Sequence, residues 1–284
     1  MFRKGKFVSP IPYQLPSTAD HVYTSLAARR LPKSGQVFCW VQTSITYHGT
    51  RALAINETWL PRCDHGEFFT DHQFSMENIA YSTVFAGFPD SYLTLFYKTR
   101  YAFHYIYNYV SKDFEWYIRA DDDTYVVMEH LKSYLSTLDP NKPYYLGYVL
   151  KPRLEHGYNT GGSGYVLSRK ALQIYNDLLY NNKTLCPNSL AEDVMMARCL
   201  ANVGIFPHDT RNSLGQNRFN AFTPYDVFYA THYHPNWTYF PEKRGYDGFA
   251  SDFISFHHLK PDEIRLFDIL LYRTNRSIKT TITS

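Results

Sequence analysis

The sequence predicts one α/β domain with a mainly parallel sheet, and three observations lead to this prediction. Short apolar runs of strand length alternate with helix-like stretches, which is the pattern of βαβ units. Hydrophobic residues make up 44% of the 284 residues and charged residues 19%, as in a packed globular protein. The sequence has no internal repeat and no low-complexity linker, so one domain is favoured over two.

The chain divides into three parts. Residues 1–35, with scattered Pro and Lys, are expected to form an irregular extension over the fold. Residues 36–260 are expected to form the folded domain, and residues 261–284 a C-terminal tail or helix. Within the domain the expected elements are, in chain order, a strand at 36–42, helices at 51–59 and 97–109, a strand at 114–120, a helix at 128–138, and strands at 144–149 and 166–167.

One of these helices has a tyrosine at every fourth position. Tyr97, Tyr101, Tyr105 and Tyr109 therefore form one stripe, which we interpret as core packing rather than a ligand platform. Aromatic residues make up 18% of the chain, and the rigid apolar face and polar tip of tyrosine also suit carbohydrate surfaces. The net charge of +3 is too small to indicate a nucleic-acid partner.

Three consecutive carboxylates, Asp121, Asp122 and Asp123, end the apolar run at 114–120. Adjacent acids on an ordered backbone raise one another's pKa and stay ionised at low cost only beside a cation. Mn²⁺ or Mg²⁺ takes one or two carboxylates and fills its other positions with water and phosphate oxygens. The triplet predicts a metal-diphosphate site at a strand end, where α/β sheets bind ligands. A solvated acidic turn is disfavoured, because a second apolar run follows at 125–128.

Three glycines, Gly161, Gly162 and Gly164, precede the strand at 166–167, and Ser168 could cap the helix after it. Glycine permits a tight turn at positive φ or a close approach of the backbone to a ligand, and the sequence leaves both open. The spacing matches neither a phosphate loop nor a dinucleotide fingerprint. Nucleotide kinases and dehydrogenases are therefore disfavoured.

A second acidic motif opens a helix near residue 192. Ser189 and Glu192 have the spacing of a capping box, which gives Glu192 a structural role. Asp193 has no such role, and the helix dipole at this first turn favours its ionised form. An ionised carboxylate facing a cleft can act as a general base. The alternative for Asp193 is simple compensation of the dipole.

Near the C-terminus, His257 is a candidate metal ligand if it meets the triplet.

The cysteines favour an oxidising compartment. Cys39, Cys63, Cys186 and Cys199 are even in number and lack C-x-x-C spacing, and we predict the local pairs Cys39 with Cys63 and Cys186 with Cys199. Four sequons begin at asparagines 56, 182, 236 and 275. No stretch approaches 18 apolar residues and residues 1–16 have no apolar core, so neither an anchor nor a signal peptide is visible.

Taken together, these motifs resemble the β1,3-glycosyltransferases of the core 1 galactosyltransferase type. The resemblance runs from about Phe38 to His258 and rests on five motifs in the family's order. It implies a GT-A fold, Mn²⁺, and inverting transfer of galactose from UDP-galactose to the 3-hydroxyl of O-linked N-acetylgalactosamine. It also implies a Golgi location, a glycoprotein or glycopeptide acceptor, and compatibility with a homodimer. The five motifs are 121–125, 161–168, 192–193 between the cysteines, 209–211 and 251–257.

The resemblance also assigns residue roles. Asp123 and His257 look like the metal ligands, and Asp193 looks like the catalytic base. Trp237 and Tyr239 fall in the acceptor region. Asp121 and Asp122 are expected near the metal and the donor ribose, Thr43 and Arg51 in the uridine pocket. The donor-binding set is therefore Thr43, Arg51, Asp121, Asp122, Gly162 and Gly164.

Two departures from the family pattern concern the acceptor. Phe249-Ala250 stands where the family usually has adjacent cysteines, and the aromatic acceptor stretch between Phe222 and Pro241 is shorter and altered. A fringe-like or other β1,3-N-acetylglucosaminyltransferase would share the metal and base and differ in its sugar pockets. A non-catalytic chaperone related to this family lacks the intact aspartate triplet, so the triplet favours an enzyme.

Overall fold

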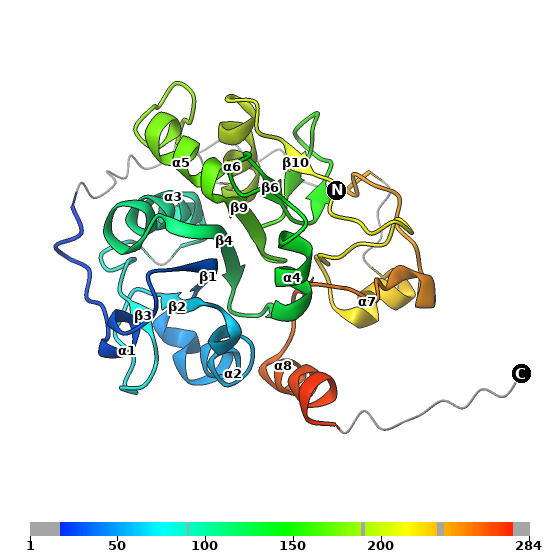
Figure 1. The fold of residues 1–284 in the computed structure, drawn as a ribbon, viewed down its shortest axis with the longest axis horizontal. Coiled ribbons are helices and arrows are strands. Elements are labelled where there is room, and N and C mark those ends of the chain that lie inside the picture. The colour runs from blue at the N-terminus through cyan, green and yellow to red at the C-terminus, as the bar shows by residue number, and fades with distance from the viewer. Residues whose placement is uncertain (1–17, 90, 189–190, 232–235, 275–284) are drawn as a thin grey trace, which may run out of the picture.

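The computed structural model describes residues 18–89, 91–188, 191–231 and 236–274. A seven-stranded sheet runs through the middle of the molecule (Figure 1). Strands β1, β2, β3 and β4 are parallel to one another, while β9 is antiparallel to both β4 and β6. In spatial order the strands are β10 (Pro207–His208), β6 (Tyr145–Leu146), β9 (Tyr165–Ser168), β4 (Asp113–Asp121), β1 (Ser34–Gln42), β2 (His65–Phe69) and β3 (Tyr81–Ser82).

Helices cover the sheet. In Figure 1, α3, α5 and α6 lie together on one side of the strands, and α2 and α8 on the other. α3 packs against α6, and α2 packs against α8. The predicted α/β fold of the GT-A type, a mainly parallel sheet flanked by helices, is confirmed. The helices are α1 (Leu26–Arg29), α2 (Leu53–Glu57), α3 (Leu95–Tyr105), α4 (Met128–Leu135), α5 (Arg169–Ile174), α6 (Glu192–Ala201), α7 (Pro224–Tyr229) and α8 (Pro261–Asp268).

The two central strands form the core because they are apolar on both faces. In β1 the run from Val37 to Val41 is fully buried, and in β4 so are Trp116, Tyr117 and Ile118. Such continuous apolar runs are typical of strands covered by helices on both faces. The two disulfides pair as predicted, Cys39 with Cys63 and Cys186 with Cys199. The first joins β1 to the turn after α2, and the second joins α6 to the loop before it.

Most predicted elements are present, with differences at their ends. The strand expected at 144–149 is divided by Gly147 into β6 and β7 (Val149–Leu150), and β7 pairs with β8 (Tyr158–Asn159). Gly147 lies close to Asn159, since an added Cβ would lie 3.0 Å from the Asn159 Cβ. Before His257 the chain forms only the short strand β11 (Ser255–Phe256). Ser251 and Asp252 form a turn, and Asp252 accepts a hydrogen bond from Arg218.

The tyrosine stripe and the N-terminal extension each differ from the prediction in one part. Tyr97, Tyr101 and Tyr105 of α3 are buried as core residues, but Tyr109 is 48% exposed in the following turn. In the stretch expected to be irregular, α1 forms a short helix capped by Ser25, whose hydroxyl also accepts a hydrogen bond from the Tyr81 amide. No helix in the described ranges combines the length and apolar character needed to cross a membrane.

Candidate active site

The aspartate triplet lies at the carboxyl end of β4, beside the end of β1. The parallel register pairs Gln42 with Asp121, so Thr43 follows β1 at the same edge. The Thr43 hydroxyl donates a 2.7 Å hydrogen bond to Asp122. Arg51 reaches the same place from the π-helical turn His48–Ala52, with its Nη1 3.1 Å from Asp122 Oδ1 and 3.3 Å from Asp123 Oδ2. The structure therefore brings Thr43 and Arg51 to the triplet, and their predicted place in a uridine pocket stays a prediction.

His257 returns to the triplet because β11 pairs with β5 (Tyr125–Val126), directly after the aspartates. Its Nε2 lies 3.0 Å from Asp123 Oδ1, and the amide of Leu259 donates to the backbone oxygen of Asp123. His258 Nδ1 lies 4.0 Å from Asp123 Oδ2. One ligand atom from each of these three residues lies within 4.8 Å of the others.

This cluster fits a divalent cation such as Mn²⁺, which accepts imidazole nitrogen alongside carboxylate oxygen. Asp123 Oδ1 is buried and faces the Nε2 atom of His257, so a cation at this place would have both atoms as ligands. Burial acts to raise the pKa of Asp123, but His257 and Arg51 hold it below its usual value. His258 was missing from the predicted ligands. The adjacent histidines were the only sequence signal for it, and its approach depends on a left-handed backbone, φ 63°.

The glycines of the 161–164 turn have packing roles in this structure. A Cβ at Gly162 would lie 1.9 Å from Cε1 of His257, so only glycine leaves room for the ligand ring. Gly164 has φ 80°, a left-handed conformation that glycine adopts without strain. The Gly162 carbonyl accepts a hydrogen bond from Thr124, next to the triplet. The predicted contact of Gly162 and Gly164 with the donor stays a prediction.

A cavity of about 420 Å³, which we call the Thr43 cavity, opens beside the triplet. Its polar wall includes Asp121, Asp122 and Lys98, and its rim carries Tyr47 and the 72% exposed Tyr92. The Arg51 guanidinium lies 4.3 Å from the Tyr47 ring centroid. Burial raises the pKa of Asp122 to about 6, against the lowering effect of the Thr43 hydrogen bond. The cavity therefore combines a flat aromatic wall with hydrogen-bonding groups beside the cation cluster.

Asp193 lies in the first turn of α6, close enough to the Thr43 cavity for its charge to act on the Tyr92 phenol. It is partly accessible, and burial raises the pKa of its carboxyl while Arg119 and Arg153 oppose this rise. The carboxylate is thus a stronger base than an exposed aspartate. Asp121 acts on the same Tyr92 phenol, so the triplet and Asp193 face one region.

The predicted capping box is wrong. α6 begins at Glu192 itself, and the residue before it, Ala191, supplies no side-chain cap; Ser189 lies outside the described residues. Glu192 is buried and accepts a 2.9 Å hydrogen bond from the Tyr165 hydroxyl. Its side chain is therefore directed into the sheet, because a buried tyrosine and the buried Arg119 offer it stronger partners than the helix end. Burial raises the pKa of Glu192 to about 7, against the lowering effect of Arg119.

A second cavity, of about 350 Å³, borders the candidate metal cluster through His257 and His258 and is called the Trp237 cavity. Trp237 is 48% exposed, and its carbonyl accepts a hydrogen bond from the Lys151 amide. Tyr239 is not part of this wall. Its ring packs near Gly157, where an added Cβ would lie 2.8 Å away. The lining is Leu150, Thr160, Ala221, Phe222, Trp237, Thr238, His257 and His258.

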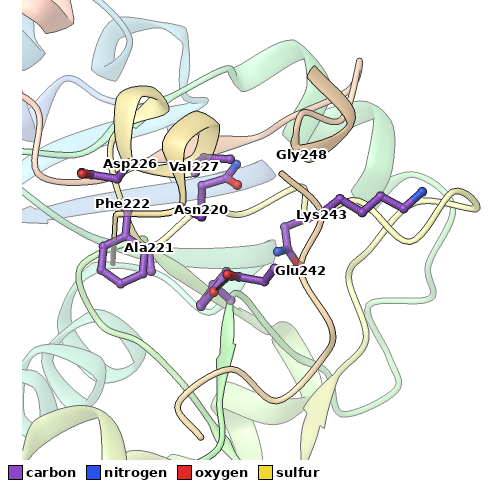
Figure 2. Close-up of a pocket in the computed structure, with 11 residues that line it drawn as sticks. Asn220, Ala221, Phe222, Asp226, Val227, Glu242, Lys243 and Gly248 are labelled. Atoms are coloured by element: carbon purple, nitrogen blue, oxygen red, sulfur yellow. Dashed lines mark hydrogen bonds between the residues drawn. The ribbon is translucent and has the colours of Figure 1, made fainter. Parts of the chain in front are cut away.

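A third, smaller pocket shares Ala221 and Phe222 with the Trp237 cavity (Figure 2). Its volume of about 20 Å³ holds a water molecule but no sugar. The Tyr148 hydroxyl donates to Glu242 there, and in Figure 2 the Lys243 side chain points away from the other labelled residues. This pocket supports the wall of the Trp237 cavity and is no substrate site.

Comparisons with known proteins give the following similarities. A family model described as Fringe-like matches residues 33–213. The glycoprotein-N-acetylgalactosamine 3-beta-galactosyltransferase 1 of Xenopus laevis is 29% identical over 252 residues, 86% of this chain and 68% of that protein. A beta-1,3-glucosyltransferase of Mus musculus is 27% identical over 176 residues, 61% of this chain and 35% of that protein.

Among solved structures, a glycosyltransferase involved in the glycosylation of the major capsid of PBCV-1 matches with a TM-score of 0.41 and 14% identity. The match covers 84% of this chain and 100% of that one. Of the two relatives in sequence, this chain spans 68% of the first and only 35% of the second.

Proposed function

Because the chain belongs to the Fringe-like family and is a glycosyltransferase, we propose that it transfers galactose from UDP-galactose to O-linked N-acetylgalactosamine. The acceptor atom is the 3-hydroxyl of that sugar on Ser or Thr of a glycoprotein. The galactosyltransferase similarity over 86% of the chain supports this choice of donor and acceptor.

One observation supports the proposal most strongly: the metal-ligand cluster lies between two cavities. Asp121 and Asp122 line the Thr43 cavity, and His257 and His258 line the Trp237 cavity. Asp123 joins the two sides through its contact with His257. A two-substrate transfer needs a donor site and an acceptor site that meet at the reacting carbon, and two cavities beside one candidate metal cluster support this assignment.

In this proposal the uridine and ribose bind in the Thr43 cavity, against Tyr47 and within reach of Asp122. Asp123, His257 and His258 would hold Mn²⁺, with His258 as an addition to the predicted ligands. When bound, the cation would neutralise negative charge on the UDP diphosphate. Arg51, which contacts both Asp122 and Asp123, adds a positive charge at the same place.

Asp193 acts as the general base. Its carboxylate accepts the proton of the acceptor 3-hydroxyl as that oxygen bonds to the anomeric carbon of galactose. The bond from that carbon to the phosphate oxygen breaks on the opposite side, so UDP leaves with the bonding electrons and the anomeric configuration inverts. The acceptor ring stacks on Trp237, whose exposed indole offers an apolar face.

A donor screen tests the proposal. We would measure transfer to an N-acetylgalactosaminyl peptide from UDP-galactose, UDP-glucose and UDP-N-acetylglucosamine, each with and without Mn²⁺. We expect metal-dependent transfer from UDP-galactose alone. Transfer from UDP-glucose would instead favour the activity named for the Mus musculus relative, which matches a smaller part of this chain. No transfer from any donor would contradict the proposal.

The cellular location follows from the same proposal. Both cysteine pairs are disulfides, which form and persist in oxidising compartments. Together with the similarity to a galactosyltransferase that modifies glycoproteins, they support the Golgi lumen as the place of action.

A further inference from the structure

The sheet register places the buried side chain of Arg119 near the helix that carries Asp193, the proposed catalytic base. Arg119 of β4 is the antiparallel partner of Tyr165 of β9, so both side chains lie on one face of the sheet. In Figure 1 this part of the sheet lies beside α6. The Tyr165 hydroxyl reaches Glu192, the first residue of α6, at 2.9 Å. Two strands therefore direct polar groups at the start of the helix that carries Asp193.

The Arg119 guanidinium needs compensating charges, because its side chain is 2% exposed. Its Nη2 lies 2.8 Å from Asp121 Oδ1. The other terminal nitrogen of the guanidinium, Nη1, lies beside Gly161, and so does the Glu192 carboxyl. A Cβ on Gly161 would lie 3.0 Å from Arg119 Nη1 and 2.6 Å from Glu192 Oε2. The glycine thus keeps open the space that lies between the guanidinium and the Glu192 carboxyl.

We propose that Arg119 is a positioning residue whose buried guanidinium, held between Asp121 and Glu192, fixes Asp193 relative to the Thr43 cavity. The inference rests on the proposed role of Asp193 as base. Arg119 touches no substrate in this proposal. It joins the strand that carries the aspartate triplet to the helix that carries the base, so the two catalytic parts keep one spacing.

Arg119 also changes the electrostatics of the base. The groups whose charge or burial acts around Asp193 come from six places in the fold: Glu192 on α6, Arg119 on β4, Arg153 after β7, Tyr92 before α3, Tyr145 on β6 and Tyr158 on β8. Of these, Arg119 and Arg153 lower the pKa of Asp193. Because Arg119 is fully buried, its field is screened little by solvent or salt. Removing its charge must therefore raise the pKa of Asp193.

The direct test is an NMR titration of the Asp193 side-chain carbon in protein labelled with ¹³C-carboxyl aspartate, assigned with Asp193→Asn. We expect the pKa of Asp193 to rise by about 1 unit in Arg119→Gln and to stay near the parent value in Arg119→Lys. Arg62→Gln is the matched control. It removes a 2.6 Å ion pair to the buried Asp268, on the C-terminal helix, and should lower stability without moving the Asp193 titration.

A kinetic measurement follows the same variants. In Arg119→Gln the acid limb of the kcat profile should move to higher pH and kcat should fall about tenfold or more, with the KM for UDP-sugar changed little. Arg119→Lys should restore the acid limb. The inference is overturned if Arg119→Gln is folded and leaves both the NMR titration and the acid limb unchanged. The NMR titration does not require enzyme activity. If the parent enzyme proved inactive, the proposed function would be contradicted, but the titration would still test this inference.

Discussion

The proposed donor and acceptor sides of the site are built differently. The proposed donor side comprises Thr43, Arg51 and the aspartate triplet at the ends of two parallel strands, where Thr43 and Arg51 contact Asp122 and Asp123 at 2.7 to 3.3 Å. The residues predicted for the acceptor side, Trp237 and Tyr239, lie in an irregular segment and are 48% and 38% exposed. In this proposal the strand ends fix the nucleotide-binding groups. The acceptor groups lie on loops, which can change without disturbing the sheet.

The largest effect should come from the shared cluster. Asp123→Ala removes the only carboxylate among the candidate metal ligands of the described residues, so turnover should fall below detection. In the parent, Mn²⁺ with UDP at about 100 times its Kd should stabilise the fold by about 2.7 kcal/mol. The thermal shift should disappear in Asp123→Ala. A parent protein whose melting temperature ignores saturating Mn²⁺ and UDP would refute the metal site.

The second largest effect should come from the proposed base, Asp193. Asp193→Asn keeps the shape but removes basicity, so kcat should fall by roughly 10² to 10⁴ while UDP and Mn²⁺ binding stays nearly intact. Because burial raises the pKa of Asp193, parent activity should fall with decreasing pH at a higher pH than for an exposed aspartate. The neighbouring Glu192→Gln should cost much less in kcat. A larger loss in Glu192→Gln would show that the base is assigned to the wrong residue.

A smaller effect should distinguish the proposed acceptor side from the proposed donor side. Trp237→Ala should raise the KM for the glycopeptide acceptor about tenfold, because it removes a stacking surface worth roughly 1.4 kcal/mol. Its Kd for UDP should not change. Tyr239→Ala is the matched control, since Tyr239 does not line the Trp237 cavity and should change the acceptor KM less. Equal effects of the two substitutions would mean that the acceptor extends toward Tyr239.

The difference between strand ends and loops also explains which parts of the site could be predicted from the sequence. The position of the triplet followed from an apolar run ending in acids, and the nearness of Thr43 and Arg51 followed from the family resemblance. Both depend on local patterns that the sheet preserves. The approach of His258 depends on a left-handed backbone beside an antiparallel pair, which no local pattern indicates. Long-range pairing, rather than propensity, places this ligand.

The sequence missed His258, but for Glu192 it predicted a partner that the structure does not show. Its spacing from Ser189 matched a capping box, but the partner that decides its position is Tyr165, 27 residues away in sequence. Local spacing cannot reveal a buried tyrosine and arginine on adjacent strands. The acceptor side was also the part least determined by sequence, because Trp237 reaches its cavity through backbone contacts with β7 and the Lys151 amide.

The smallest effect on turnover should come from Glu192→Gln, but this substitution gives the clearest dependence of stability on pH. The ordinary pKa of 4.5 for glutamate is raised to about 7 in the fold, mainly by burial. Between these values the folded state binds more protons than the unfolded state, so the stability of the parent falls as pH rises from about 4.5 to 7. The loss is on the order of 3 kcal/mol. Glutamine does not titrate and still accepts the Tyr165 hydrogen bond.

Thermal melts of the parent and Glu192→Gln from pH 4.5 to 8 measure this difference. The variant should gain stability relative to the parent as pH rises and reach a constant advantage above about pH 7. Asp64→Asn is a control of opposite sign, because Lys132 and two backbone amides hold the pKa of Asp64 below its usual value despite partial burial. Its destabilising effect should stay nearly constant from pH 4.5 to 8 and shrink only below the ordinary aspartate pKa of 3.8. If the two variants instead changed in parallel with pH, the buried carboxyl of Glu192 could not be the titrating group, and its position between Tyr165 and Arg119 would be wrong.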